Sequence, residues 1–207
     1  MVIYYFCPMQ DTYKTIEQAA EGYIIEKKSK FLSFVFHVES PEEVKGIVDE
    51  HRKKYYDARH VCWAYMLGPE REEYRSNDDG EPSGTAGRPI LGQINSYGLT
   101  NVLIIVIRYF GGTLLGTSGL IKAYKEAAED AVKNAEIVEK TVDRALTVRF
   151  EYVLLNDVMR TLKQFEEVSW EQNFKESCTM KLCIRKSEFQ RLHDSLSQIY
   201  GVKIEKE

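Results

Sequence analysis

Apolar and polar positions along the first quarter of the chain follow the spacing of short strands and one amphipathic helix. Residues 16–26 and 31–38 are rich in β-branched and aromatic side chains, and Lys27-Lys28-Ser29-Lys30 separates them, which predicts a β-hairpin. Ser40-Pro41-Glu42-Glu43 follows, with a capping serine and a proline at the first helical position. Apolar side chains at helical spacing from Val44 to Tyr55 continue this predicted helix.

The middle of the chain predicts three further strands and two helices. The strands are expected at residues 60–67, 72–76 and 102–107, and the last of them is an uninterrupted apolar run, typical of a strand buried on both faces. Residues 90–96 indicate a short helix. Thr117 or Ser118 is expected to cap a longer helix that runs to about Glu136, whose alanine-rich side suits close packing on a sheet.

After Lys140 the pattern starts again with strands and helices in the order β-α-β-β-α-β. The strands are expected at residues 145–150, 168–174, 178–184 and 202–205, and the helices at 154–165 and from Ser187 to about Ile199. Ser187 and Gln190 have the spacing of a capping box for the second helix. The order is that of the ferredoxin-like split βαβ unit. We therefore predict an α+β protein of two domains, residues 1–139 and residues 140–207.

Composition and charge exclude several classes of protein. Of the 207 residues, 43% are hydrophobic and 29% are charged, which is typical of a globular chain. The net charge of −4 gives no overall attraction to nucleic acid, so phosphate contacts would need a local basic patch. The longest apolar stretch, Val102–Ile107, is far shorter than the about 20 residues that span a bilayer.

The ends of the chain and the cysteines bear on its location. The apolar segment Met1–Pro8 lacks the positive region and the cleavage site of a signal peptide, so we expect a cytoplasmic protein with no membrane partner. None of the four cysteines forms a Cys-x-x-Cys pair, which argues against a zinc knuckle and for reduced thiols.

The first segment with candidate chemistry is a glycine-rich stretch between the buried strand and the long helix. Glycines at such a place let backbone amides approach an anion, and the helix N-terminus adds favourable dipole potential. The spacing from Gly111 to Gly116 imitates a phosphate-binding loop, but Thr117 stands where the lysine should be, so no Walker-type site is predicted. Equally, the glycines can simply permit tight packing. The candidate residues are Arg108, Tyr109, Gly111, Gly112, Gly116 and Ser118.

The second candidate segment is the loop from Asn77 to Pro89, which is too long and too glycine-rich for a mere connector. Its carboxylates can hold Mg²⁺ while the small residues and an arginine receive a phosphate, although the spacing does not fit an EF-hand. The alternative is a solvated turn. The candidate metal ligands are Asp78, Asp79 and Glu81, and the candidate anion-binding residues are Gly84, Thr85, Gly87 and Arg88.

Basic runs and a histidine complete the candidates. Lys27–Lys30 and the run Arg52, Lys53 and Lys54 can contact phosphates, with Tyr55 and Tyr56 available for stacking, or can form solvated ends of their elements. His60 is either a structural residue or a general base. No Gly-x-Ser-x-Gly motif or nucleophile with a defined base occurs, so we predict no catalytic residue and no cofactor.

Three segments resemble the motifs of the YigZ/IMPACT family. The most specific match is Arg108-Tyr109-Phe110-Gly111-Gly112. The segment Asp78–Gly87 resembles the bacterial form of the second family motif, and Arg59–Tyr65 resembles the strand before that motif. The resemblance covers the chain from about Asp11, so Met9 is an alternative start to Met1.

This resemblance implies a fold and a field of activity. The N-terminal domain of the family is similar to the second domain of ribosomal small-subunit protein five and to domain four of elongation factor G, a ribosomal-protein-like β-α-β sandwich. The C-terminal domain is similar to domain five of that factor. Eukaryotic relatives are linked to control of translation initiation, so the resemblance implies association with RNA or the ribosome.

Two interpretations follow. In the first, the protein is a non-enzymatic, translation-associated regulator that contacts RNA phosphates through Arg108, Arg88 and the run 52–54. In the second, it is an enzyme or sensor for a small phosphorylated ligand or nucleotide bound at the glycine-rich loops.

Overall fold

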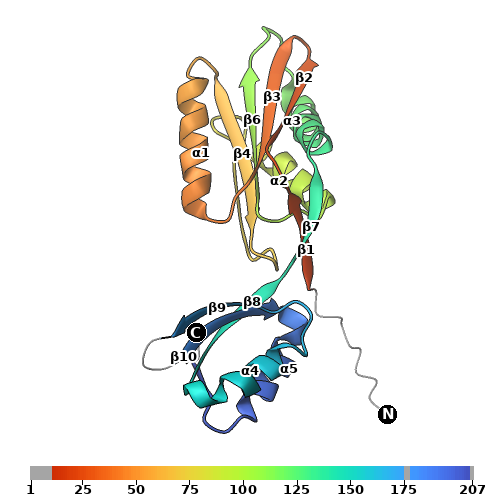
Figure 1. Ribbon diagram of the computed structural model, residues 1–207. Helices are drawn as coiled ribbons and strands as arrows, with labels where there is room; N and C mark the ends of the chain where they lie inside the picture. The colour runs from red at the N-terminus through yellow and green to blue at the C-terminus, as the bar shows by residue number, and fades with distance from the viewer. Residues whose placement is uncertain (1–10, 175–177, 206–207) are drawn as a thin grey trace, which may run out of the picture. The chain divides into compact units, whose positions relative to one another are not determined.

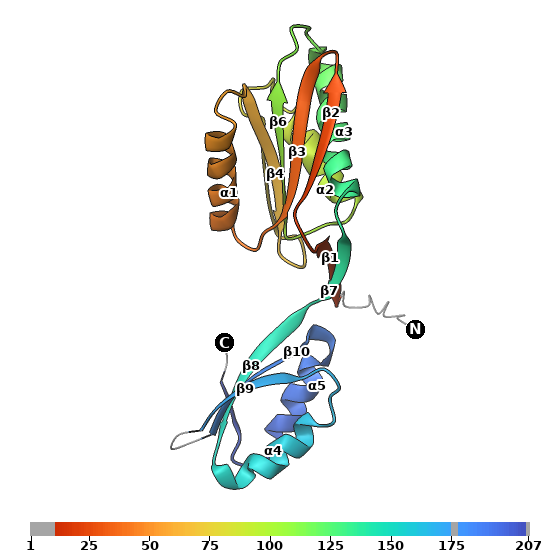
Figure 2. The same cartoon turned by 45° about the horizontal axis from the view of Figure 1, so that its top comes forward.

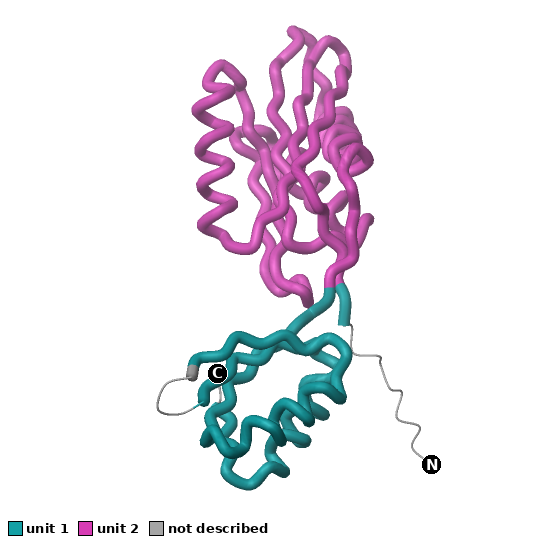
Figure 3. The backbone as a smooth tube through the Cα atoms, in the orientation of Figure 1, with its two compact units in different colours: residues 1–12, 141–207 teal, residues 13–140 magenta. Residues whose placement is uncertain are grey.

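The computed structural model describes residues 11–174 and 178–205, and Cys7 and the two candidate starts therefore lie outside it. The chain divides into two compact units (Figure 3). Residues 13–140 form one, called the central unit here, and residues 141–205 form the other, the terminal unit, together with Asp11 and Thr12. That residues 1–139 and 140–207 are two independently folding domains stays a prediction.

The central unit is built on a five-stranded sheet in which every neighbouring pair is antiparallel (Figure 1). Its spatial order is β2-β3-β6-β4-β5. The strands are β2 (Ala20–Glu26), β3 (Ser29–His37), β4 (His60–Leu67), β5 (Glu73–Asn77) and β6 (Val102–Tyr109). A separate two-stranded sheet pairs β1 (Thr12–Ile16) with β7 (Ile137–Thr141).

Helices cover the two faces of the five-stranded sheet unequally. One face packs against α2 (Gly87–Ser96) and α3 (Gly116–Lys133) through a large apolar core. The other face packs against α1 (Pro41–Lys54), which lies beside β4 and leaves β2 without a helix in front of it (Figures 1 and 2). On the face of the sheet that carries α1, the part formed by the hairpin β2–β3 is therefore not fully covered by a helix.

The sequence predicted most of these elements. The hairpin is confirmed, with Lys27 and Lys28 as its turn residues at φ values of 45° and 68°. The start of α1 is confirmed too, because the Ser40 hydroxyl accepts a hydrogen bond from Glu43 N at 3.2 Å.

The predicted cap of α3 was wrong, and two strands, β1 and β7, were missed. The helix α3 begins at Gly116, and Thr117 and Ser118 lie within it, so neither caps it: its N-cap position is Leu115, which supplies no side-chain bond. The strand β7 follows α3 where the sequence indicated only a boundary region.

The terminal unit has the predicted order β-α-β-β-α-β. Its antiparallel sheet has the order β11-β8-β10-β9. The elements are β8 (Asp143–Phe150), the short 3₁₀ turn Tyr152–Leu154, α4 (Leu155–Leu162), β9 (Ser169–Phe174), β10 (Cys178–Arg185), α5 (Lys186–Ser197) and β11 (Lys203–Glu205). Alternate side chains of β8 and β10 build its apolar core with α4 and α5. The mixed α and β class is thus confirmed.

The predicted capping box of α5 was wrong. Ser187 donates its backbone N–H to Asp11 Oδ1 at 2.9 Å and its hydroxyl to Asp11 Oδ2 at 2.6 Å, while Gln190 donates to Asp194 instead. An acceptor 176 residues away in sequence therefore satisfies the helix start, which no local pattern can reveal. Among the described helices none combines the length and apolar character needed to cross a membrane.

Candidate functional site

The register of the sheet gathers the segments with candidate chemistry at one end of the central unit. Arg108, near the end of β6, lies opposite His60 at the start of β4 and opposite Phe31 near the start of β3. The hairpin turn, the end of α1, the loop 78–86 with the start of α2, and the loop 110–115 are therefore neighbours at what we call the loop end. The two glycine-rich segments, separate in sequence, meet there.

A buried polar network joins these two segments. Arg108 Nη1 donates to Glu81 Oε1 at 2.6 Å, and the Tyr124 hydroxyl donates to the same oxygen at 2.8 Å. His60 Nε2 lies 3.8 Å from it, and His60 Nδ1 donates to the carbonyl oxygen of Asp79 at 2.8 Å. Arg108 is only 5% exposed and Glu81 9%. We call these four side chains, with Cys62, the Glu81 network.

This burial changes the role expected for Arg108. A buried charge that loses its partner is strongly destabilising, so the guanidinium is committed to Glu81. The geometry favours a structural role for Arg108 over the phosphate contact predicted from the sequence. A structural role is favoured for His60 too, because the hydrogen bond from Nδ1 to the Asp79 carbonyl oxygen fixes its ring.

Cys62 and Tyr124 stay protonated inside the network. Burial raises the pKa of the Cys62 thiol, and nearby Glu81 adds to the effect although the Tyr124 hydroxyl opposes it. Burial also raises the pKa of Tyr124, with further contributions from Cys62 and Glu81. A thiol with a raised pKa is a poor nucleophile. Cys62, Cys178 and Cys183 are free thiols, as the sequence predicted.

Asp78 organises the loop 78–86 and the start of α2 through backbone amides. Its carboxylate accepts hydrogen bonds from the N–H groups of Gly84, Ala86 and Gly87 at 2.8–3.0 Å. Burial alone would raise the pKa of Asp78, but these three bonds and the charge of Arg88 outweigh it and hold the pKa below its usual value. The loop is an ordered structure around this carboxylate rather than a solvated turn.

The three candidate metal ligands face different partners. Asp79 forms an ion pair with Arg52 at 2.7 Å and accepts a hydrogen bond from Val61 N at 2.7 Å. Asp78 accepts hydrogen bonds from backbone N–H groups, and Glu81 accepts one from Arg108. The described part of the chain contains no cluster of three or more histidine, cysteine or carboxylate side chains arranged to hold a metal ion. Magnesium binding by these carboxylates therefore gains no support from their arrangement.

The candidate glycines serve two different needs. A side chain at Gly111 would place its Cβ 2.1 Å from the carbonyl carbon of Lys28, and one at Gly87 would lie 2.8 Å from Asn77 N, so these two permit close packing. Gly112, Gly116 and Gly84 have φ values of 84°, 71° and 76°, in the left-handed region that favours glycine. Thr85 is buried and donates to the Pro82 carbonyl oxygen at 2.6 Å.

Most of the remaining candidates are exposed, and Tyr109 is half-buried. Lys53, Lys54 and Arg88 lie on the surface of the loop end, as does Ser118 in the first turn of α3, and the side chain of Arg52 is 42% exposed beside Asp79. The Tyr109 hydroxyl donates to Asp57 at 2.9 Å; burial and this carboxylate raise the pKa of Tyr109 to about 12. Lys53, Lys54 and Arg88 are therefore the exposed basic candidates available to a polyanion, whereas Arg52 is already paired with Asp79.

A pocket that sequence reasoning did not identify opens at the hairpin. Its volume is about 480 Å³, and we call it the hairpin pocket. It is lined by Tyr23, Lys28, Lys30, Leu32, Tyr109 and Phe110. Part of the signal was in the sequence, because Tyr23 and Ile25 are alternate residues of one strand and so lie on the same strand face. The strand register that brings Tyr109 opposite Lys30 could not be read from the sequence.

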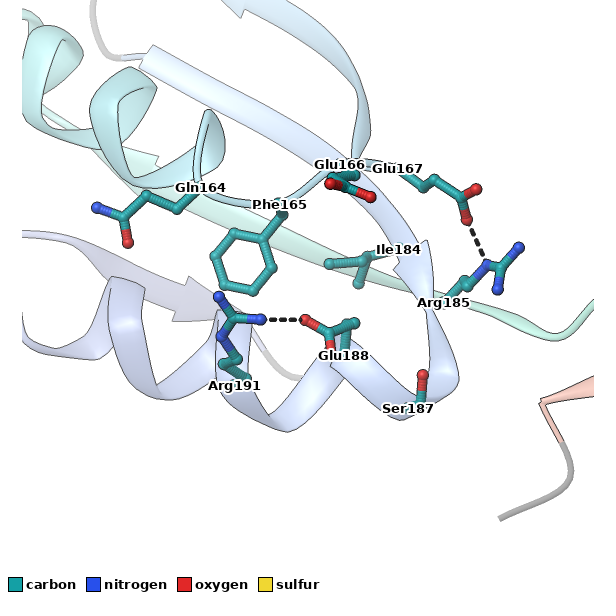
Figure 4. Close-up of a pocket in the computed structure, with 9 residues that line it drawn as sticks. All are labelled: Gln164, Phe165, Glu166, Glu167, Ile184, Arg185, Ser187, Glu188 and Arg191. Atoms are coloured by element: carbon teal, nitrogen blue, oxygen red, sulfur yellow. Dashed lines mark hydrogen bonds and ion pairs between the residues drawn. The ribbon is translucent and has the colours of Figure 1, made fainter. Parts of the chain in front are cut away.

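The terminal unit has a pocket of its own, of about 490 Å³ (Figure 4). Its charged groups are largely paired with one another: Arg191 with Glu188 at 2.7 Å, and Arg185 with Glu167. The Arg191 guanidinium also stacks 4.7 Å from the Phe165 ring centroid. Because the arginines already have partners, this pocket is a weaker candidate for an anion.

Known proteins resemble the chain over most of its length. Residues 27–132 match the Impact N-terminal domain. IMPACT family member YvyE of Bacillus subtilis is 28% identical over 94% of this chain and 90% of its own, and IMPACT family member YigZ of Escherichia coli is 37% identical over 67% and 69%. A crystal structure described as that of a hypothetical protein superposes with a TM-score of 0.72 at 27% identity, covering 95% of this chain and 99% of the other.

The domain match runs from the hairpin turn at Lys27 through the Glu81 network and all but the last residue of α3, and so includes most of the segments from which the loop end is built. The chain therefore belongs to the IMPACT family.

Proposed function

We propose that the protein is a non-enzymatic, translation-associated regulator that binds RNA, free or within the ribosome, through the loop end of the central unit. The resemblance to the family supports the connection to translation, since it implies association with RNA or the ribosome. We also propose that the central unit has the fold of the second domain of ribosomal small-subunit protein five, as the resemblance implies. The terminal unit would have a ferredoxin-like fold.

The observation that carries the proposal is a local excess of positive charge in a chain of net charge −4. Exposed basic side chains gather at the loop end from four segments: Lys27, Lys28, Lys30, Arg52, Lys53, Lys54, Arg59 and Arg88. Phosphate contacts by such groups release counterions and supply most of the sequence-independent affinity for nucleic acid. The buried carboxylate of Glu81 opposes this excess little, because Arg108 neutralises it, and Asp79 offsets the charge of Arg52 alone.

Co-sedimentation with ribosomes and separated subunits over a series of salt concentrations tests the proposal. We expect saturable binding that weakens with salt, and a double variant Lys53→Ala, Lys54→Ala that lowers the salt slope by roughly two. Lys14→Ala is the matched control, because Lys14 is exposed on β1 at the opposite end of the central unit. Absence of wild-type binding at low salt would contradict the proposal.

A second candidate function is binding of a small phosphorylated ligand at the start of α3. The N-cap residue Leu115 makes no side-chain hydrogen bond to the first turn of this helix. Gly112, before the helix, and Gly116, its first residue, have positive φ values, and glycines at such a place let backbone amides approach an anion. If this candidate holds, nucleotides or inorganic phosphate raise the melting temperature of the wild type, and Gly112→Val removes the shift. A side chain at Gly112 meets open space, so the variant acts through backbone conformation.

A further inference from the structure

The hairpin pocket combines two features that rarely occur together on a protein surface. Tyr23 is 50% exposed and Phe110 44%, so two large rings meet water, and the neighbouring Ile25 is 59% exposed on the same strand face. Exposed lysines, Lys28 and Lys30, stand beside them. Large exposed apolar groups rimmed by charge mark binding surfaces.

We propose that the hairpin pocket binds an unpaired RNA base, which stacks on Phe110 and Tyr23 while its flanking phosphates meet Lys28 and Lys30. This inference rests on the RNA binding proposed above and adds the kind of RNA and the residues that recognise it. The backbone contacts of the loop end then position the strand, and the pocket selects for single-stranded segments.

Two of the three aromatic side chains, Tyr109 and Phe110, have contacts that hold them in place before any ligand arrives. The hydrogen bond from the Tyr109 hydroxyl to Asp57 fixes that ring at the pocket wall. The guanidinium carbon of Arg108 lies 5.7 Å from the centroid of Phe110, within cation–π range, so the buried network orients the exposed ring. A ring that is already ordered loses little entropy when a base stacks on it.

The hairpin turn is fixed as well. Gly111 packs directly on the backbone of Lys28 and Ser29, and its N–H donates to the Ser29 hydroxyl at 3.2 Å. The backbone positions of Lys28 and Lys30 are therefore set relative to Phe110, which follows β6. Aromatic and basic groups separated by about 80 residues in sequence are thus held side by side.

The distribution of charge indicates where phosphates lie. None of the six residues that line the hairpin pocket is acidic. The adjoining groove on the other side of Tyr23 is lined by Glu21 and Asp130 and would repel a phosphate. A nucleotide is consequently favoured at the hairpin end of this surface. A duplex is not, because its bases are stacked on each other and their faces are unavailable.

Fluorescence anisotropy with labelled RNA of about eight nucleotides, a usual length for single-strand sites, tests the inference. We expect the single strand to bind more tightly than a duplex of the same sequence. Phe110→Ala and Tyr23→Ala should each weaken single-strand binding by about tenfold, while Phe110→Tyr, which keeps a ring, restores it. Lys28→Gln should lower the salt slope by about one. Tyr74→Ala, an exposed tyrosine on β5, is the matched control.

The outcomes separate the two proposals. If the wild type binds no RNA and no ribosomes, both fail. If it binds RNA with a normal salt slope but Phe110→Ala and Tyr23→Ala bind equally well, or if the duplex binds as tightly as the single strand, only the pocket assignment is overturned. Concentration-dependent self-association that Phe110→Ala abolishes, without an effect on RNA affinity, would assign the pocket to a second copy of the chain instead.

Discussion

Arg108 and Phe110 are two residues apart in sequence, yet they belong to regions of opposite character. Arg108 is in the Glu81 network, whose side chains are largely buried and paired with one another. Phe110 is in the hairpin pocket, where rings and lysines face solvent. The segments that carry the family resemblance mostly build the first region, and the groups available to a ligand mostly occupy the second. A motif can thus mark the support of a site rather than its contacts.

The largest effect that would test this division comes from Arg108→Met. The variant leaves the Glu81 carboxylate buried without its ion pair, so the free energy of unfolding should fall by about 3–5 kcal/mol. Urea unfolding followed by circular dichroism measures it. Adding Glu81→Gln to the variant should recover part of the loss, since no unpaired charge is left. A stable Arg108→Met protein that has lost only RNA binding would overturn the structural assignment.

Gly111→Ala tests the junction between the two regions. The added Cβ would lie 2.1 Å from the Lys28 carbonyl carbon, and the strand and hairpin backbones must move apart, at a cost of about 2–3 kcal/mol. Thermal unfolding measures the loss of stability. The RNA anisotropy assay measures the affinity of the hairpin pocket for RNA, which should fall in parallel. Gly92→Ala on α2 is the matched control, because a side chain there meets open space.

Asp78→Asn tests the contribution of the loop 78–86 to stability apart from that of the Glu81 network, because the contribution of the Asp78 carboxylate depends on pH. The pKa of Asp78 is lowered in the folded state, so its stabilising contribution is complete above the unfolded pKa, about 4, and is lost as the pH falls through the folded value. We expect a loss of about 1.5 kcal/mol at pH 7. The difference from the wild type in urea unfolding should shrink below pH 4; a constant difference would mean that the carboxylate charge is not what matters.

Tyr23→Ala should produce the smallest change in stability. Its ring is half exposed, and the bond that anchors this position, to Asp130, comes from the backbone N–H, so the unfolding free energy should change by no more than about 0.5 kcal/mol. Calorimetric melting temperatures measure this. A large loss would show that the hairpin pocket, like the Glu81 network, is mainly structural.

Local patterns in the sequence were enough for most elements but not for the site. The strand 60–67 and the cap at Ser40 depend on neighbours in sequence, and both were predicted. The partners of Glu81 lie 27 residues away at Arg108 and 43 residues away at Tyr124. Such contacts depend on strand register and on helix packing, so the sequence indicated the charged residues without showing which of them would be neutralised.

The hydrogen bonds from Ser187 to Asp11 have a consequence for synthesis on the ribosome. The terminal unit takes strand-forming and helix-forming segments from the C-terminal third of the chain but completes its last helix start with a residue near the N-terminus. Because domains fold as the chain emerges, the central unit has all its residues available first, and Asp11 must wait until α5 has left the exit tunnel. A fragment that begins at residue 141 therefore lacks the two carboxylate oxygens of Asp11 that accept hydrogen bonds from Ser187.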